Sequence, residues 1–311
     1  MNDRSVAPPS SFEIPFRGPG QLATIWSWGR SGPDGGKALI RTRRDGTRRI
    51  AADAPTRVRW RSNSEFIVEQ EVQPIGHGSA TRIVRMSLDG AVIEVLSDRE
   101  GLSGSEPSPD GRWVFVERFG ERGALRSEIR DLAAGFRLHT LYQNSLRPSG
   151  FAWHAVWSPE GERLVASIRL REATGVVPHL ILLSRDRSSF SRLPDQRADG
   201  EGDGGGIVPL FWSEDGIYAR SNSGLLRCDP AGLGCTLVYS PGKARFAVAG
   251  VRAGDKRALL LVQDLRLDPL EVRAKEIHDV DLATGEGQML LRLPDGVFLS
   301  DIDWIQDDNH S

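Results

Sequence analysis

A strand followed by a short turn of Asp and Gly recurs along this chain and limits what it can fold into. Six copies align on turn aspartates that lie 42 to 55 residues apart: Asp45, Asp89, Asp131, Asp186, Asp229 and Asp281. An Asp at the start of a turn bonds its own backbone and a Gly accepts positive φ, so each copy predicts a hairpin. A recurring spacing of this kind is typical of folds in which each repeat is one structural unit.

A second element alternates with the first and consists of an apolar strand, a polar turn and a strongly apolar strand. The clearest copies are Ser108–Val116 and Trp157–Ala166, a third begins at Trp212, and weaker ones begin at Trp60 and Gly254. Four strands in every ~40–50 residues are typical of the blades of a β-propeller.

The motifs of these turns resemble those of a known family. The Ser-Pro-Asp-Gly at 108–111, its variant at 158–161 and the Leu-Asp-Gly at 88–90 resemble the repeats of TolB-type six-bladed β-propellers. Similar repeats occur in the propeller domains of prolyl oligopeptidase-type enzymes. The resemblance covers roughly residues 22–306 and implies an all-β, six-bladed β-propeller, but it is unspecific for function.

The two ends of the chain each hold part of a blade. Five blades can be assigned directly, to 57–97, 104–142, 151–193, 208–239 and 245–293. Segment 299–306 then has an inner strand without outer strands, and segment 22–51 has outer strands without an inner one. Because unpaired sheet edges are a liability, we predict that these segments pair and complete a sixth blade. Residues 1–21 are expected to be a polar tether and 307–311 a tail; the alternative is an open five-bladed structure with disordered ends.

Four tryptophans recur at one position of the repeat: Trp60, Trp157, Trp212 and Trp304. Their expected role is packing between blades, and an aromatic cage for a ligand is the alternative.

Long connections between strands are expected on one face of the propeller. They are 73–80, 169–178, 195–207 and 263–275, whereas the turns of the opposite face are tight. Binding residues concentrate on long loops that a rigid scaffold holds, so we expect function on this face. Tolerated insertions without a role are the alternative for any one loop.

Charged residues are expected around the channel mouth on the same face. Aligning the blades on their tryptophans predicts a ring made of Arg57, Arg59, Glu106, His154, Asp301 and Asp303. Buried charges need partners, so we favour ion pairing between blades that fixes the closure. The other interpretation is a polar pocket that binds a peptide terminus or a small anion.

Motifs for most catalytic chemistries are missing from the sequence. It contains no Gly-x-Ser-x-Gly elbow, no His-Glu-x-x-His and no phosphate-binding loop, so a prolyl oligopeptidase-type peptidase is not expected. The six histidines show no metal-ligand spacing. The acidic, glycine-rich stretch 199–206 offers oxygen ligands for Ca²⁺, but it does not match an EF-hand and a flexible linker is favoured. We expect no cofactor.

Charge and hydropathy bound the partners and the compartment. The 42 acidic and 40 basic residues nearly cancel without a long basic run, so nucleic-acid binding is not expected. No apolar run approaches the ~18 residues that span a bilayer. The N-terminus lacks the apolar stretch of a secretion signal, which predicts a cytoplasmic protein, or a periplasmic or extracellular one if a leader has been removed.

Two cysteines, Cys228 and Cys235, flank a six-residue turn and should face each other across a hairpin. A disulfide and a pair of reduced thiols both fit this spacing. A disulfide would favour an oxidising compartment.

Two functions fit these observations. The first is a monomeric, non-enzymatic TolB-like scaffold that binds a protein or peptide partner through the loop-rich face. The alternative is a small-molecule hydrolase or lyase with a metal at the channel mouth, held by Glu106, His154, Asp301 and Asp303. Against a cation there, Arg57 and Arg59 are expected nearby, and like charges repel.

Overall fold

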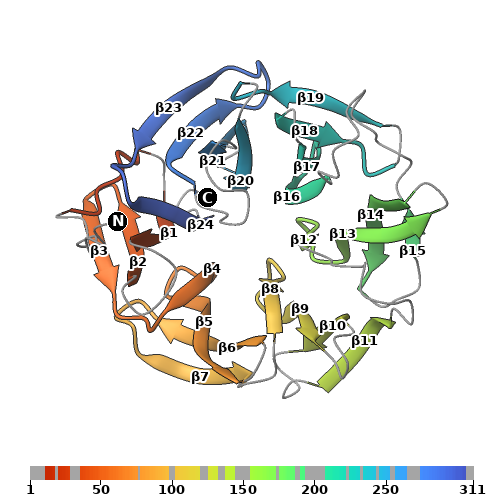
Figure 1. The fold of residues 1–311 in the computed structure, drawn as a ribbon, viewed down its shortest axis with the longest axis horizontal. Helices are drawn as coiled ribbons and strands as arrows, with labels where there is room; N and C mark the ends of the chain where they lie inside the picture. Colours follow the sequence, from red (N-terminus) through yellow and green to blue (C-terminus); the bar gives the residue numbers. More distant parts are fainter. Residues whose placement is uncertain are drawn as a thin grey trace, which may run out of the picture. The chain divides into compact units, whose positions relative to one another are not determined.

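The computed structural model describes residues 11–17, 20–28, 36–75, 78–97, 102–119, 125–131, 137–143, 155–172, 175–185, 190–192, 207–221, 224–231, 234–242, 245–252, 256–264 and 274–305. Every regular element in these ranges is a β-strand, which confirms the predicted all-β class. No helix long and apolar enough to cross a membrane occurs in them. The described strands form six four-stranded sheets, named A to F here (Figure 1).

The six sheets are distributed over two compact units. The first unit comprises residues 1–98 and 247–311, and the second comprises residues 99–246. Sheets A, B and F belong to the first unit, except for the first two residues of one strand of sheet F, and sheets C, D and E belong to the second.

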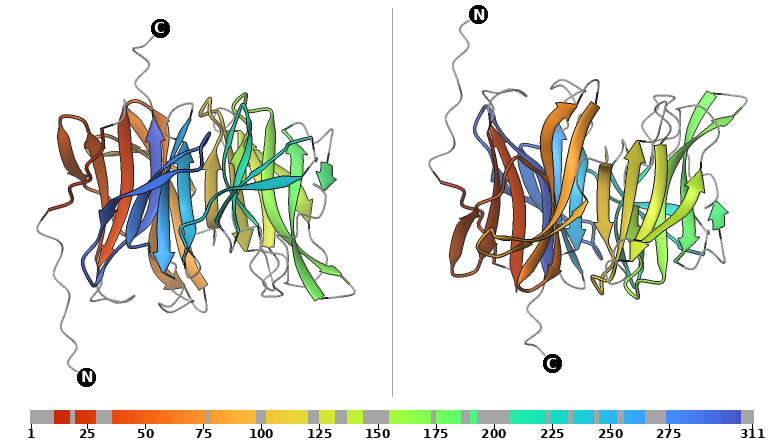
Figure 2. Two further views of the ribbon diagram at one scale, coloured as in Figure 1. Left: turned by 90° about the horizontal axis from the view of Figure 1, so that it is seen from above. Right: turned by 90° about the horizontal axis from the view of Figure 1, so that it is seen from below.

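Sheet A joins the two ends of the chain. Its order is β24-β1-β2-β3, made of Val297–Ile305, Gln21–Trp28, Gly36–Arg43 and Gly46–Ile50. The first and last of the 24 described strands pair antiparallel, with Leu22 opposite Trp304 and Ile25 opposite Asp301. Figure 2 shows β1 and β24 side by side in both views.

Sheets B and F complete the first unit. Sheet B consists of β4 (Pro55–Ser62), β5 (Glu65–Ile75), β6 (Gly78–Ser87) and β7 (Val92–Ser97). Sheet F consists of β20 (Arg245–Arg252), β21 (Arg257–Asp264), β22 (Glu276–Asp281) and β23 (Gly287–Arg292). Apolar side chains of sheets A and B form one buried cluster, which includes Ile25, Leu39, Ile50, Val58, Phe66 and Met86. The alternation of apolar residues along these strands therefore forms the core between neighbouring sheets.

The second unit repeats the same arrangement. Sheet C has the order β11-β10-β9-β8, made of Arg137–Gln143, Leu125–Asp131, Trp113–Phe119 and Leu102–Pro107. Sheet D consists of β12 (Ala155–Trp157), β13 (Arg163–Glu172), β14 (Gly175–Ser184) and β15 (Phe190–Arg192). Sheet E consists of β16 (Val208–Ser213), β17 (Gly216–Ser221), β18 (Gly224–Cys228) and β19 (Cys235–Tyr239). One buried cluster joins sheets C and D, and another joins sheets D and E.

The Ser-Pro-Asp-Gly turn has a clear physical basis. The buried hydroxyl of Ser108 accepts a hydrogen bond from the Trp113 N–H at 2.9 Å and donates one to the Asp110 carboxylate. Gly111 has a φ of 65°, and its N–H donates to the Ser108 carbonyl at 2.8 Å. The variant at 158–163 repeats these main-chain bonds and the bond to the serine hydroxyl. The motif therefore closes the turn between the first two strands of a sheet.

Residues 11–17, which lie within the segment expected to be a polar tether, are described and pack against sheet A. Ile14 and Phe16 are buried, and the Phe16 ring meets that of Trp304 edge to face at 5.4 Å. Phe12 makes the same kind of contact with Trp26 at 5.4 Å. Phe12 and Phe16 therefore fix this segment onto sheet A, which the prolines and serines around them obscure in the sequence.

Two of the four expected long loops are extended hairpins instead. In sheet B the pairing of β5 with β6 runs on to Ile75 opposite Gly78, and in sheet D that of β13 with β14 runs on to Glu172 opposite Gly175. β-Branched residues such as Val72 and Val176 favour strand over loop at these positions. Of the other two segments, 195–206 and 265–273 lie outside the described residues.

Candidate functional site

The candidate site lies where sheets A and B meet, between β24 and β4. β4 is the first strand of sheet B, so one of its edges pairs with no other described strand. Asp301 and Asp303 alternate along β24 and face this edge. Asp301 Oδ2 accepts a hydrogen bond from the Val58 N–H at 2.8 Å, and Asp303 Oδ2 accepts one from the Trp60 N–H at 2.7 Å. Two carboxylates thus bind two main-chain donors that the sheet leaves unpaired.

We call the contact of Asp301 and Asp303 with β4 the carboxylate latch. A guanidinium group completes it. Arg59 Nη1 lies 2.7 Å from Asp301 Oδ2 and also donates to the Val58 carbonyl at 2.6 Å. The side chains of Arg59 and Asp301 are only 16 % and 7 % exposed, so each charge needs a partner, and the other residue supplies one. The arrangement holds two sheets together through charge-assisted hydrogen bonds rather than presenting an open carboxylate to solvent.

The structure brings together three of the six residues predicted for the channel mouth, namely Arg59, Asp301 and Asp303. Arg57 lies on the same strand and is half-buried, with Glu69 opposite it in the register. Glu106 belongs to β8 in the second unit, where its main-chain carbonyl accepts a hydrogen bond from the Trp157 indole at 2.8 Å. His154 lies outside the described residues.

The repeated tryptophans pack at the junctions between sheets. Trp60, Trp157 and Trp212 are all less than a tenth exposed. The guanidinium of Arg163, from sheet D, lies 5.0 Å from the ring centre of Trp212 in sheet E. These contacts agree with packing between repeats as the role of the tryptophans.

Two buried pairs of polar side chains are not evident from the sequence. On β10, Glu128 and Arg130 lie 2.8 Å apart with side chains 3 % exposed. On β22, His278 Nε2 lies 2.8 Å from Glu276 Oε2. In both cases the partners are two residues apart and therefore share one face of a strand. The spacing was visible in the sequence, but the burial that makes each pair obligatory was not.

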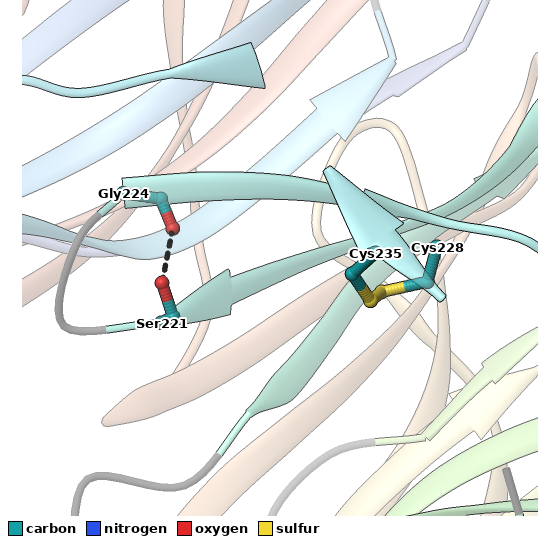
Figure 3. The surroundings of a disulfide bond; sticks show 4 residues. All are labelled: Ser221, Gly224, Cys228 and Cys235. Carbon is teal, nitrogen blue, oxygen red and sulfur yellow. Dashed lines mark hydrogen bonds between the residues drawn. A yellow bond between two sulfur atoms is a disulfide. The ribbon is translucent and has the colours of Figure 1, made fainter. Parts of the chain in front are cut away.

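The two cysteines are joined by a disulfide in sheet E (Figure 3). Cys228 on β18 pairs directly with Cys235 on β19 in the strand register, and Cys228 is completely buried. At the opposite end of β18, the Ser221 hydroxyl donates to the Gly224 carbonyl at 3.3 Å (Figure 3). The hairpin between the last two strands is thus covalently closed at one end and hydrogen-bonded to its neighbour at the other.

Within the ranges that the structure describes, no three His, Cys, Asp or Glu side chains are grouped as metal ligands. The oxygens of Asp301 and Asp303 that face β4 are bound to main-chain N–H groups, and for Asp301 also to Arg59. The described carboxylates of the candidate site therefore have a structural task in sheet contact.

Solved structures that resemble this chain share one architecture. TolB from Acinetobacter baumannii matches 94 % of the chain and 68 % of its own length, with 15 % identity and a TM-score of 0.66. A TolB described as putative, from Agrobacterium tumefaciens, matches 92 % of the chain and 99 % of its own length, with 16 % identity and a TM-score of 0.61.

The propeller domain of the Trilobed protease from Pyrococcus furiosus extends this likeness to the peptidases. It matches 90 % of the chain and 97 % of its own length, with 11 % identity and a TM-score of 0.55. The chain has a TolB-like β-propeller fold. No family model and no curated protein matches the sequence, so the resemblance establishes the fold alone. Relative to a puromycin hydrolase of similar fold, the propeller chain covers 48 % of the enzyme's length.

Proposed function

We propose that this chain is a six-bladed TolB-like propeller that binds a protein or peptide partner through its projecting hairpins. The six four-stranded sheets are its blades, and the pairing of β24 with β1 closes the ring. The carboxylate latch supports this closure, because Asp301 and Asp303 of sheet A bind β4 of the neighbouring sheet B.

The observation that carries the binding role is the length of two hairpins. In sheet B, β4 pairs with β5 only as far as Pro55 opposite Gln70, yet the β5–β6 pairing continues to Ile75. In sheet D, the β13–β14 pairing continues to Glu172 opposite Gly175, and the described part of β12, which begins at Ala155, lies opposite Ala166 and the residues before it. Figure 2 shows the β13–β14 hairpin extending past the rest of its sheet.

A projecting two-stranded ribbon contributes little to the stability of the fold. An isolated hairpin is only marginally stable in water, because two strands bury little surface. Docking an extended partner along the ribbon would supply the missing contacts, as in β-strand addition. The described residues of the hairpin arms, 71–75 and 78–82 in sheet B and 167–172 and 175–180 in sheet D, are therefore the parts of the chain best suited to bind a polypeptide.

Site-specific photo-cross-linking tests this proposal. A photoreactive amino acid is introduced at Val176 in the β13–β14 arm, or at Leu237 on β19 as a control that is 54 % exposed. The expected result is a discrete cross-linked polypeptide for Val176 and none for Leu237. Equal cross-linking at both positions, or none at Val176 in cells that express the gene naturally, would contradict binding through the arms.

A further inference from the structure

The β2–β3 hairpin of sheet A concentrates positive charge to an unusual degree. Five arginines lie within nine residues: Arg41, Arg43, Arg44, Arg48 and Arg49. Asp45 is the one acidic residue in this stretch, and its carboxylate lies 3.9 Å from Arg43 Nε with both side chains largely exposed. The whole chain carries a formal charge of −2, so this is a local feature rather than a general basic character.

Three of these arginines share one face of the hairpin. Arg41 is directly opposite Arg48 in the register, and Arg43 lies two residues from Arg41 on the same side. Leu39 and Ile50 are opposite each other on that face and are buried in the core between sheets A and B. On this face the buried pair Leu39–Ile50 is therefore followed directly by the pair Arg41–Arg48.

The cluster works against the stability of the hairpin. Like charges directly opposite each other on a sheet are destabilising. Partial burial, followed by the neighbouring charges of Arg43 and Arg48, lowers the pKa of Arg41. A hairpin under selection for stability alone would alternate the signs of its charges.

Acidic side chains of the neighbouring sheet are mostly engaged elsewhere. Glu65 lies 2.6 Å from Arg61, and Glu94 lies 3.4 Å from Arg85, all within sheet B. The pKa of Asp89 is lowered chiefly by the Ser87 hydroxyl and main-chain N–H groups, with Arg48 a smaller cause. The arginine cluster thus retains an excess of positive charge over the described acids near it.

An unpaired edge and apolar side chains adjoin the cluster. β3 is the outermost strand of sheet A, and among the described strands it pairs only with β2. A Cβ atom on Gly90 would lie 2.5 Å from the carbonyl oxygen of Ala51, so the turn before β7 packs beside the end of β3. β7 exposes Val92, Ile93 and Val95.

We propose that the β2–β3 hairpin docks an extended acidic segment of a partner protein, which adds to the edge of β3 and binds its carboxylates to the arginine cluster. An extended peptide supplies main-chain partners for the edge and side chains that alternate with the same period as Arg41 and Arg43. The planar fork of arginine suits carboxylates in bidentate pairs. A phosphate polymer or a lipid surface would satisfy the charge but would not pair with the main chain of the strand edge.

The test uses short fluorescent peptides and the full chain. The first probe alternates valine with glutamate, the second replaces glutamate with lysine, and the third carries N-methyl groups on alternate residues of the acidic peptide. Fluorescence anisotropy measures binding to the wild type, to the double variant Arg41→Gln/Arg48→Gln, and to the charge-matched control Arg163→Gln/Arg185→Gln in sheet D.

The acidic probe should bind the wild type and the control, and should lose about tenfold or more in affinity with the hairpin variant. The lysine and N-methylated probes should bind poorly. The thermal midpoint of the hairpin variant should be equal to or above that of the wild type, because the repulsion between Arg41 and Arg48 is relieved.

Three outcomes would overturn the proposal. If the acidic probe binds the hairpin variant as tightly as the wild type, the arginines do not recognise it. If the N-methylated probe binds as tightly as the unmethylated acidic probe, the peptide does not add as a strand to β3. Arginine-dependent binding of duplex DNA or anionic vesicles, without binding of the peptide, would assign the surface to phosphates. These results do not depend on the hairpin arms, so they are separable from the cross-linking experiment.

Discussion

The carboxylate of Asp303 accepts the main-chain N–H of Trp60 across the boundary between two sheets, 2.7 Å away. Asp301 does the same for Val58 and adds the guanidinium of Arg59. The bonded residues are 242 or 243 positions apart in sequence, and the two acceptors and the two main-chain donors each lie two residues apart on their strand. A strand edge is capped by side chains of the neighbouring sheet instead of by another strand.

Replacing Asp301 by Asn should destabilise the protein because it leaves the Arg59 charge in a poorly solvated place. We expect a loss of about 3 kcal/mol in the free energy of unfolding, as for other broken ion pairs of low exposure. Urea denaturation of the variant measures this loss. As a control, Glu160→Gln breaks the exposed pair with Arg163 and should cost less than about 1 kcal/mol. Similar losses for the two variants would show that the carboxylate latch carries little energy.

Removing the last strand should have a larger effect than any single substitution. A chain that ends at Val297 lacks almost all of β24, so the β1 edge and the N–H groups of Val58 and Trp60 lose their partners. We expect aggregation or loss of a cooperative unfolding transition. Size-exclusion chromatography and calorimetry measure both, and a monomer with an unchanged melting curve would argue against closure through β24.

Reducing the disulfide should weaken sheet E without unfolding the chain. Cys228 and Cys235 are seven residues apart, so the bond constrains only a short loop of the unfolded state. The double variant Cys228→Ala/Cys235→Ala should lose about 2 kcal/mol of stability. Thermal melting with and without a thiol reductant measures this loss for the wild type, and the double variant should not respond to the reductant. A wild type that melts identically in both conditions would mean that the thiols are not oxidised in the purified protein.

Substituting two glycines in the β17–β19 region of sheet E should distinguish the cost of backbone strain from the cost of a steric clash. Gly224 and Gly234 have φ values of 139° and 118°, which side chains rarely adopt. A Cβ on Gly224 would lie 2.0 Å from the Tyr239 carbonyl oxygen, whereas a Cβ on Gly234 would meet nothing within 4 Å. We therefore expect Gly234→Ala to cost about 1–2 kcal/mol through strain and Gly224→Ala to cost more. If the two variants melt at the same temperature, the close approach of Tyr239 is not maintained in solution.

Tyr218 should titrate later than an ordinary tyrosine. Its burial, together with the hydrogen bond to the Asp215 carboxylate at 2.8 Å, raises its pKa to about 12. Because the folded state holds this proton more tightly than the unfolded state, the stabilisation is complete below about pH 10 and declines as the pH rises towards 12. Phenolate absorbance should show one late component among the three tyrosines, absent in Tyr218→Phe. Titration of all three near pH 10 would contradict this environment.

Sequence patterns predicted the all-β class and the propeller repeat because both depend on local alternation and turn chemistry. Aligning the repeats on tryptophan also placed Arg59, Asp301 and Asp303 near one another. It could not show that the carboxylates bind main-chain N–H groups, because an unpaired edge is a property of the assembled sheets. Phe12 and Phe16 were overlooked because three apolar residues among prolines and serines resemble a linker. The redox state of Cys228 and Cys235 depends on the compartment as well as on spacing.

The position of β24 has a consequence for how the protein is made. Strands β1, β2 and β3 of sheet A are synthesised before residue 51, yet β24 leaves the ribosome after all the other described strands. During translation β1 must wait with one edge unpaired for the whole intervening chain. The nascent chain is therefore most exposed to misassociation at its N-terminal sheet, and chaperone capture of that region would end when the final strand docks.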